Sequence, residues 1–134
     1  MAAAVTPTDV QKMEFDVTTA EGPCRVTVVT GMLTAGLLAN SGTQSLSLTA
    51  LVDPTLSPGQ FRKATATAAL VSTEAGLNAS PTQNIFAFSV DGVEASFDGQ
   101  TGRTELRVDL TVSVSNGSAV IQKITFQVMT LAKL

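Results

Sequence analysis

Residues 86–98 read FAFSVDGVEASFD, and this stretch decides the fold class. Apolar and polar side chains alternate on both sides of Asp91-Gly92, which is the pattern of a half-buried β-strand. Asp-Gly suits the positive φ angles of a two-residue hairpin turn. We therefore predict a hairpin whose cross-strand pairs are Val90 with Val93, Phe88 with Ala95, and Phe86 with Phe97.

The same alternation continues to the C-terminus, in Thr104–Val114 and Ser118–Leu131. A two-residue turn at Asn116-Gly117 would place apolar side chains opposite polar ones. A three-residue loop, Ser115 to Gly117, matches the apolar faces and gives Gly117 the left-handed position that such loops need. This register predicts a second hairpin, with Val112 opposite Val120, Val108 opposite Ile124, and Leu106 opposite Phe126.

A third hairpin is predicted near the N-terminus, where Met13, Phe15 and Val17 alternate with polar residues. A four-residue loop, Ala20 to Pro23, places both apolar sets on one face, which is the condition that fixes register. The predicted pairs are Val17 with Val26 and Phe15 with Val28. The single cysteine, Cys24, belongs to this apolar set, and we interpret it as a small hydrophobic residue that points inward.

The middle of the chain contains two further predicted strands. Leu46–Val52 alternates and ends at Asp53-Pro54, and Phe61–Val71 is a strand of small residues. Its alanine face (Ala64, Ala66, Ala68) suits packing under a bulkier strand, whereas Lys63, Thr65 and Thr67 form the other face. Residues 32–39 fit either a strand or a short helix, and Ser72–Asn84 is predicted to be a long loop.

About eight short strands with little helix predict an all-β fold, an antiparallel β-sandwich of about eight strands. A closed or partly open β-barrel is the alternative. Residues 1–11, rich in Ala, Thr and Pro, precede the strand pattern and are expected to form an extended N-terminal arm, loose or laid along a neighbouring subunit. Residues 12–134 then form a single β-sandwich domain.

The amino-acid composition argues against several classes of partner. Of the 134 residues only 14% are charged, against roughly 25% in typical soluble domains. A net charge of −3 without a basic run argues against nucleic acid, and the absence of Trp and Tyr argues against a sugar or other small-molecule ligand. No apolar stretch is long enough to span a membrane and no signal peptide is visible, so we expect cytoplasmic synthesis and no membrane partner.

The sequence offers little for catalysis. Without histidine and with one cysteine, the chain cannot form a Ser-His-Asp or Cys-His arrangement or a His- or Cys-ligated zinc site. Acid–base candidates are Glu94, Asp98, Glu105 and Asp109, and we interpret Glu94 and Asp98 as solvated charges on an outer face. Asp91, Glu94 and Asp98 provide too few ligands for Ca²⁺. We therefore expect no catalytic, cofactor-binding or metal-binding residues, and no enzyme.

Three hypotheses about function remain. A weakly charged β-domain fits a non-enzymatic structural or assembly subunit that forms a homo-oligomer, shell, filament, or virion or tail component. The alternative is a small binding module for a glycan or a protein, using the Ser72–Asn84 and Asp98–Arg103 loops. A carboxylate-dependent enzyme is a third reading, which the missing His, Trp and Tyr weigh against.

Overall fold

The structure, a computed structural model, describes residues 2–76 and 86–134. All regular secondary structure in these residues is β-strand. The strands in chain order are β1 (Ala2–Ala4), β2 (Pro7–Thr19), β3 (Gly22–Val52), β4 (Phe61–Gly76), β5 (Phe86–Asp98) and β6 (Arg103–Lys133). Residues 32–39 therefore lie within a strand, and β4 extends into the segment predicted to be a loop; residues 77–85 lie outside the described part.

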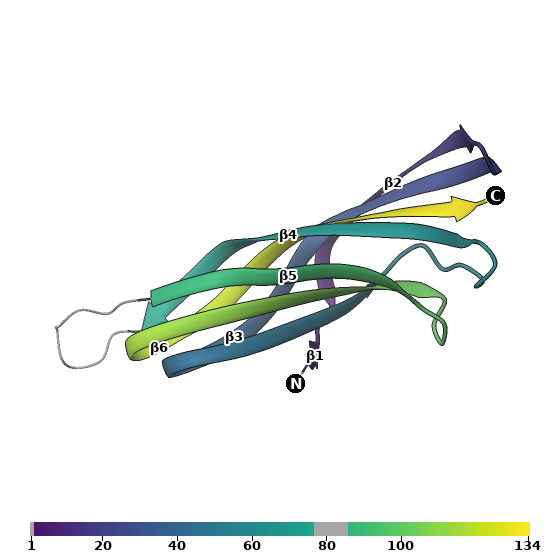
Figure 1. The fold of residues 1–134 in the computed structure, drawn as a ribbon. Helices are drawn as coiled ribbons and strands as arrows, with labels where there is room; N and C mark the ends of the chain where they lie inside the picture. Colours follow the sequence, from purple (N-terminus) through teal and green to yellow (C-terminus); the bar gives the residue numbers. More distant parts are fainter. Residues whose placement is uncertain (1, 77–85) are drawn as a thin grey trace.

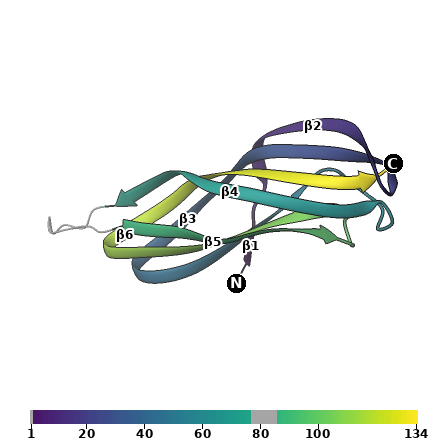
Figure 2. The same ribbon diagram turned by 45° about the horizontal axis from the view of Figure 1, so that its top comes forward.

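Strands β3 and β6, each 31 residues long, pair with each other in antiparallel fashion over almost their whole length. Both bend midway, so that each contributes one half to each of two sheets (Figure 1). Sheet I contains β1, residues 42–52 of β3, residues 103–114 of β6, and β5. Sheet II contains β2, residues 22–34 of β3, residues 123–133 of β6, and β4, which lie side by side in Figure 2.

Two sheets of four strands pack against each other without closing into a barrel, which confirms the predicted eight-stranded sandwich. The core receives Leu48, Leu106 and Val108 from sheet I, and Ile124 and Phe126 from sheet II, all at most 3% exposed. At the edge, the Phe61 ring of β4 stacks on the Phe97 ring of β5, with centroids 5.0 Å apart. The two sheets are thus joined by shared strands and by side chains across the gap.

The bends coincide with irregularities in the β3–β6 ladder. Asn40 pairs with Ser118 and Gly42 pairs with Val114, so residues 115–117 lie opposite Ser41 alone. Gly42 has a φ of 114°, a conformation that glycine adopts without steric cost. Extra residues on one strand bend it and increase its twist, which allows both strands to pass from one sheet to the other.

The predicted C-terminal hairpin is therefore wrong. Val108 pairs with Leu48 on one side and with Val93 on the other, so neither of its edges is available to Ile124. The residues that the prediction placed opposite each other are nevertheless buried together. Val108 and Ile124 belong to one core cluster, but to opposite sheets. Gly117 lies inside β6, so a turn no longer explains its position.

The predicted hairpin at Asp91-Gly92 is also wrong. Strand β5 runs straight through this dipeptide and pairs with β6 along its length. Val90 pairs with Leu110 and Gly92 with Asp109, so Asp91 is the extra residue of a β-bulge. Its carboxylate accepts hydrogen bonds from the hydroxyls of Ser89, at 2.7 Å, and Thr111. These bonds hold the bulge where a reversal was expected.

The N-terminal hairpin exists, but its register differs from the prediction. Val17 pairs with Cys24 and Phe15 with Val26, which leaves only Ala20 and Glu21 in the turn. The Thr19 hydroxyl accepts a hydrogen bond from the Glu21 amide and donates one to the Gly22 carbonyl. With Gly22 at a φ of 108°, these bonds close a turn two residues tighter than the loop we predicted.

The expected N-terminal arm is part of the sheets of its own chain. Ala2–Ala4 pair in parallel with Ser47–Thr49 in sheet I, and Pro7 begins β2 in sheet II. The boundary after residue 11 is therefore not a structural one. By contrast, the alanine face of β4 packs as predicted, because Ala66, Ala68 and Leu70 contact the core.

Gly31 provides a test of the packing. A β-carbon at this position would lie 2.9 Å from Cζ of Phe126 and 3.1 Å from the Thr8 carbonyl oxygen. We predict that Gly31→Val lowers the free energy of unfolding by about 1–3 kcal/mol through overpacking. Gly59→Ala, at a site with no atom within 4 Å, is the control and should change it little. Urea denaturation of both variants measures the difference; equal midpoints would contradict this packing.

Candidate interaction surface

The outer face of sheet II carries an apolar patch. Because the register alternates, the side chains that point away from the core form rows across the strands. One row runs from Met13 through Val28 to Met129, and the next from Phe15 through Val26 to Leu131. We call the following eight residues the apolar face: Met13, Phe15, Val17, Cys24, Val26, Val28, Met129 and Leu131.

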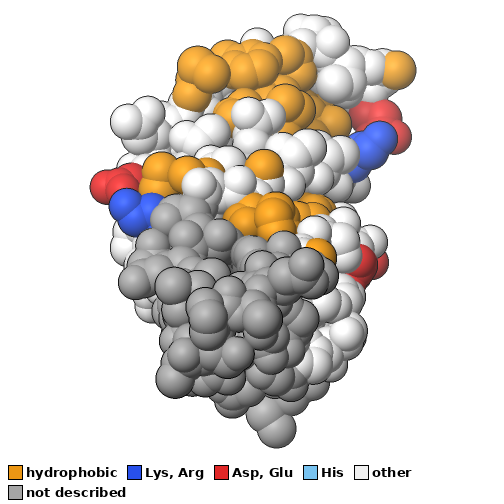
Figure 3. Space-filling view, turned by 90° about the vertical axis from the view of Figure 1, so that its left-hand side faces the viewer, with side chains coloured by type: hydrophobic (Ala, Val, Ile, Leu, Met, Phe, Trp, Pro, Cys, Tyr) orange, Lys and Arg blue, Asp and Glu red, His pale blue; other side chains and the backbone are white. Residues whose placement is uncertain are grey.

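Three of these side chains are well exposed: Met13 at 61%, Phe15 at 46% and Met129 at 40%. Hydrophobic side chains gather at the top of the molecule in Figure 3, the side on which β2 lies in Figure 1. Exposed contiguous apolar surface of this kind marks interaction sites in soluble proteins.

The sequence had suggested that this face points inward. Val29 and Leu33 of β3 are at most 1% exposed in the core, so the alternate positions Val26 and Val28 must point outward. Pairing then turns Phe15 and Met13 outward as well. The polar side chains of β2 lie on the opposite side of sheet II. There Arg25 Nε donates a hydrogen bond to Asp16 Oδ1 at 2.9 Å, which lowers the pKa of that carboxyl.

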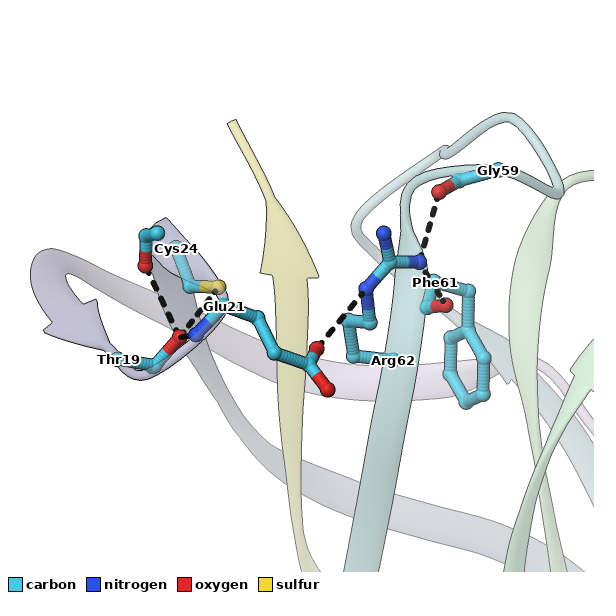
Figure 4. Close-up of polar contacts among 7 residues, drawn as sticks. Thr19, Glu21, Cys24, Gly59, Phe61 and Arg62 are labelled. Carbon is cyan, nitrogen blue, oxygen red and sulfur yellow. Dashed lines mark hydrogen bonds and ion pairs between the residues drawn. The ribbon is translucent and has the colours of Figure 1, made fainter.

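Cys24 lies at the end of the apolar face. It is 2% exposed, as predicted for a small hydrophobic residue, but it points away from the core, beside Val17. Its sulfur lies 3.6 Å from the Thr19 hydroxyl oxygen (Figure 4). Nearby, Arg62 donates to the Gly59 carbonyl at 2.8 Å and lies 3.7 Å from the Glu21 carboxylate. This end of the face is therefore held by polar contacts.

The outer face of sheet I is polar. Ser47 donates to Asp109 Oδ1 at 2.5 Å, and Arg107 Nε donates to the same oxygen at 3.1 Å. These bonds, that of Ser47 first, lower the pKa of Asp109. Bonds from Thr111 and then Ser89 lower the pKa of Asp91 in the same way. The two sheets thus present opposite kinds of surface to solvent.

The remaining candidate carboxylates belong to this polar face or to its end. Glu94 lies opposite Arg107, and Glu105 lies opposite Ser96. Asp98 accepts from the Thr101 hydroxyl at 2.7 Å and from the Gln100 amide, which lowers its pKa. Its carboxylate caps the 99–102 turn that joins β5 to β6. A lowered pKa keeps Asp98 and Asp109 ionised at neutral pH, whereas a general acid needs a raised one.

A cleft of about 500 Å³ lies where the chain crosses from β1 to β2. Val5, Pro7 and Leu51 supply its apolar lining, and Arg103 and Glu105 are charged residues at its wall. The Arg103 guanidinium lies 3.4 Å from the Asp53 carboxylate. The cleft is therefore of ligand size, with its cation already paired inside the chain.

Within residues 2–76 and 86–134, no three His, Cys, Asp or Glu side chains gather as metal ligands would. The same residues contain no helix that could span a membrane. Comparison with known proteins gives no match to a family model, a curated protein or a solved structure. The function is therefore inferred from the two outer faces of the sandwich and from the cleft beside β1.

The polar face yields a prediction about pH. We expect Asp109 to titrate below 3.8, its ordinary value, and Ser47→Ala to raise that pKa because the variant removes the main hydrogen-bond donor. A depressed pKa stabilises the folded state above the unfolded value, and this contribution disappears as the pH falls through the folded one. Side-chain carboxyl ¹³C titration by NMR measures both pKa values.

Asp98 is the internal control for this titration. Its pKa is lowered mainly by Thr101, so it should not move in Ser47→Ala. An Asp109 pKa that is the same in both proteins would contradict the hydrogen bond from Ser47.

Proposed function

We propose that this chain is a structural subunit, not an enzyme, and that it self-associates through the apolar face of sheet II. The observation that carries the proposal is the exposure of Met13, Phe15 and Met129 on one continuous sheet surface. Covering such side chains removes apolar area from water, which stabilises association by about 25 cal/mol per Å² before the costs of binding.

The low charge content supports the same proposal. With 14% charged residues, the chain has few charges to keep copies apart. What the assembled object is, a closed homo-oligomer, a shell, a filament, or a virion or tail component, depends on which surfaces meet and on their symmetry. These classes share one requirement, a surface that another copy covers.

A small binding module for a glycan or a protein is the alternative. The cleft beside β1 is the feature that favours it, since its volume falls in the range of ligand sites. The paired Arg103 and the absence of Trp and Tyr weigh against it. A chain that stays monomeric at all concentrations would favour this alternative.

Self-association is tested by light scattering coupled to size-exclusion chromatography over a range of concentrations. We predict a mass above 13.8 kDa that grows with concentration, and a dissociation constant raised about 10- to 100-fold by Phe15→Glu, which introduces a charge into the contact. Thr18→Glu adds the same charge to the opposite face of the same strand and should leave association unchanged.

Two results would contradict the proposal. Wild-type protein that stays at the monomer mass up to its solubility limit would exclude self-association. Equal effects of Phe15→Glu and Thr18→Glu would show that net charge, and not the apolar face, governs assembly.

A further inference from the structure

We infer that the partner of the apolar face is the same face of a second copy, so that two chains stack sheet II against sheet II about a two-fold axis. This inference rests on the proposed function and names the contact. The surfaces that a second copy could offer are the outer face of sheet I, the strand edges, and the outer face of sheet II.

The outer face of sheet I is a poor partner for methionine and phenylalanine side chains. It carries Glu94, Glu105 and Asp109 with Arg107, and Asp109 is already bonded to Ser47 and Arg107. Covering these groups with apolar side chains would remove water from charges and provide no new hydrogen bonds, which costs free energy.

The edge strands β4 and β5 are interrupted. The pairing of β4 with β6 shifts between Phe61 and Lys63 and again on both sides of Ser72, and the pairing of β5 shifts at Asp91. Bulges twist an edge out of line, and an edge lysine such as Lys63 opposes the addition of another strand. The edge at β5 is therefore broken at Asp91, and the edge at β4 is regular only from Lys63 to Leu70. The edge at β2 is regular from Gln11 to Thr19, but Lys12, Glu14 and Asp16 place charges along it, which oppose the addition of another strand.

The outer face of sheet II matches itself in chemistry. Its apolar rows run through the middle of the sheet, across β2, β3 and β6. Among its described outward positions on paired strands, the charged residues are Lys63, Lys123 and Lys133. Lys133 lies opposite Cys24 and Lys123 opposite Thr34, at the two ends of the face. Long lysine side chains at the rim can extend into water while their stems cover apolar neighbours.

The outer face of sheet II approaches the area of a specific dimer interface. Four strands about 4.8 Å apart, over nine residues of about 3.3 Å each, give the whole face a flat footprint of roughly 570 Å². The apolar rows cover β2, β3 and β6, and the polar side chains of Thr65 and Thr67 on β4 complete the face. Side-chain relief raises the accessible area above that figure, towards the roughly 800 Å² per partner of a standard interface. Two-fold, self-complementary contacts are also the commonest in homo-oligomers.

Two substitutions of opposite charge at Val28 test the contact between the two copies. Val28 lies between Met13 and Met129, at the middle of the apolar row, and it meets its own copy when the two-fold axis passes over it, whether that axis runs along or across the strands. We predict that Val28→Glu and Val28→Lys are each monomeric where the wild type is dimeric, because like charges meet. Mixed in equal amounts they should form heterodimers at least about tenfold tighter than either variant alone.

Matched variants guard against effects of folding and net charge. Ser96→Glu and Ser96→Lys, on the exposed outer face of sheet I, should each dimerise like the wild type. If the half-buried Val28 tolerates no charge, Met129→Glu replaces it, mixed with either Met129→Lys or Met13→Lys. One of these mixtures restores association, and which one does so gives the direction of the axis.

The outcomes separate this inference from the proposed function. A monomeric wild type overturns both. Self-association of Val28→Lys alone, strengthened over the wild type and weakened by added salt, would mean contact with the acidic sheet I of another copy. Assembly that no variant at Val28, Met13 or Met129 changes would mean contact through an edge. Either result overturns the stacked dimer and leaves a self-associating subunit.

Discussion

The rest of the structure depends on one interaction, the antiparallel ladder between β3 and β6. Each strand has 31 residues, and the ladder joins them from Cys24–Lys133 at one end to Val52–Thr104 at the other. Because both strands bend together, one ladder forms the centre of two sheets. Every other strand is added to a side of it: β1 and β2 to β3, and β4 and β5 to β6.

This ladder also links the fold to the proposed function. In the first half of β3 both faces are apolar: Val29 and Leu33 fill the core, while Val26 and Val28 point outward. A strand that is apolar on both faces is typical of sheets that are covered on both sides. Sheet I covers one side of sheet II, and β2 and β6 extend the uncovered side with Phe15 and Met129. We propose that a second copy covers it.

The sequence pattern predicts the strands and most core residues, but it does not predict which strands pair with each other. Alternation placed Leu106, Val108 and Ile124 on buried faces, and they are buried. The same alternation is compatible with two side chains that are neighbours within one sheet, and with two side chains that face each other from opposite sheets. Asn116-Gly117 and Asp91-Gly92 marked real irregularities, but such dipeptides suit a bulge as well as a reversal. The difference is decided by pairing with β3, at sequence separations from 52 residues (Val52–Thr104) to 109 residues (Cys24–Lys133).

The apolar face was missed for a related reason. The prediction paired Phe15 with a valine of β3, and Phe15 does pair with one, Val26. The prediction also assumed that these side chains face the core, whereas they point outward. The signal that could have revealed the error is Thr27-Val28-Val29, where two adjacent apolar residues mean that both faces of the strand are apolar. In sheet I, Glu94 lies on the outer face, where the ordinary alternation of β5 had placed it.

The most direct test of this account is the set of backbone cross-strand nuclear Overhauser contacts made by Val108. The ladder predicts contacts to Leu48 on one side and to Val93 on the other. Backbone contacts between Val108 and Ile124 would instead mean that β6 folds back on itself as a hairpin. That result would remove the shared ladder, and with it the register that turns Phe15, Val28 and Met129 outward.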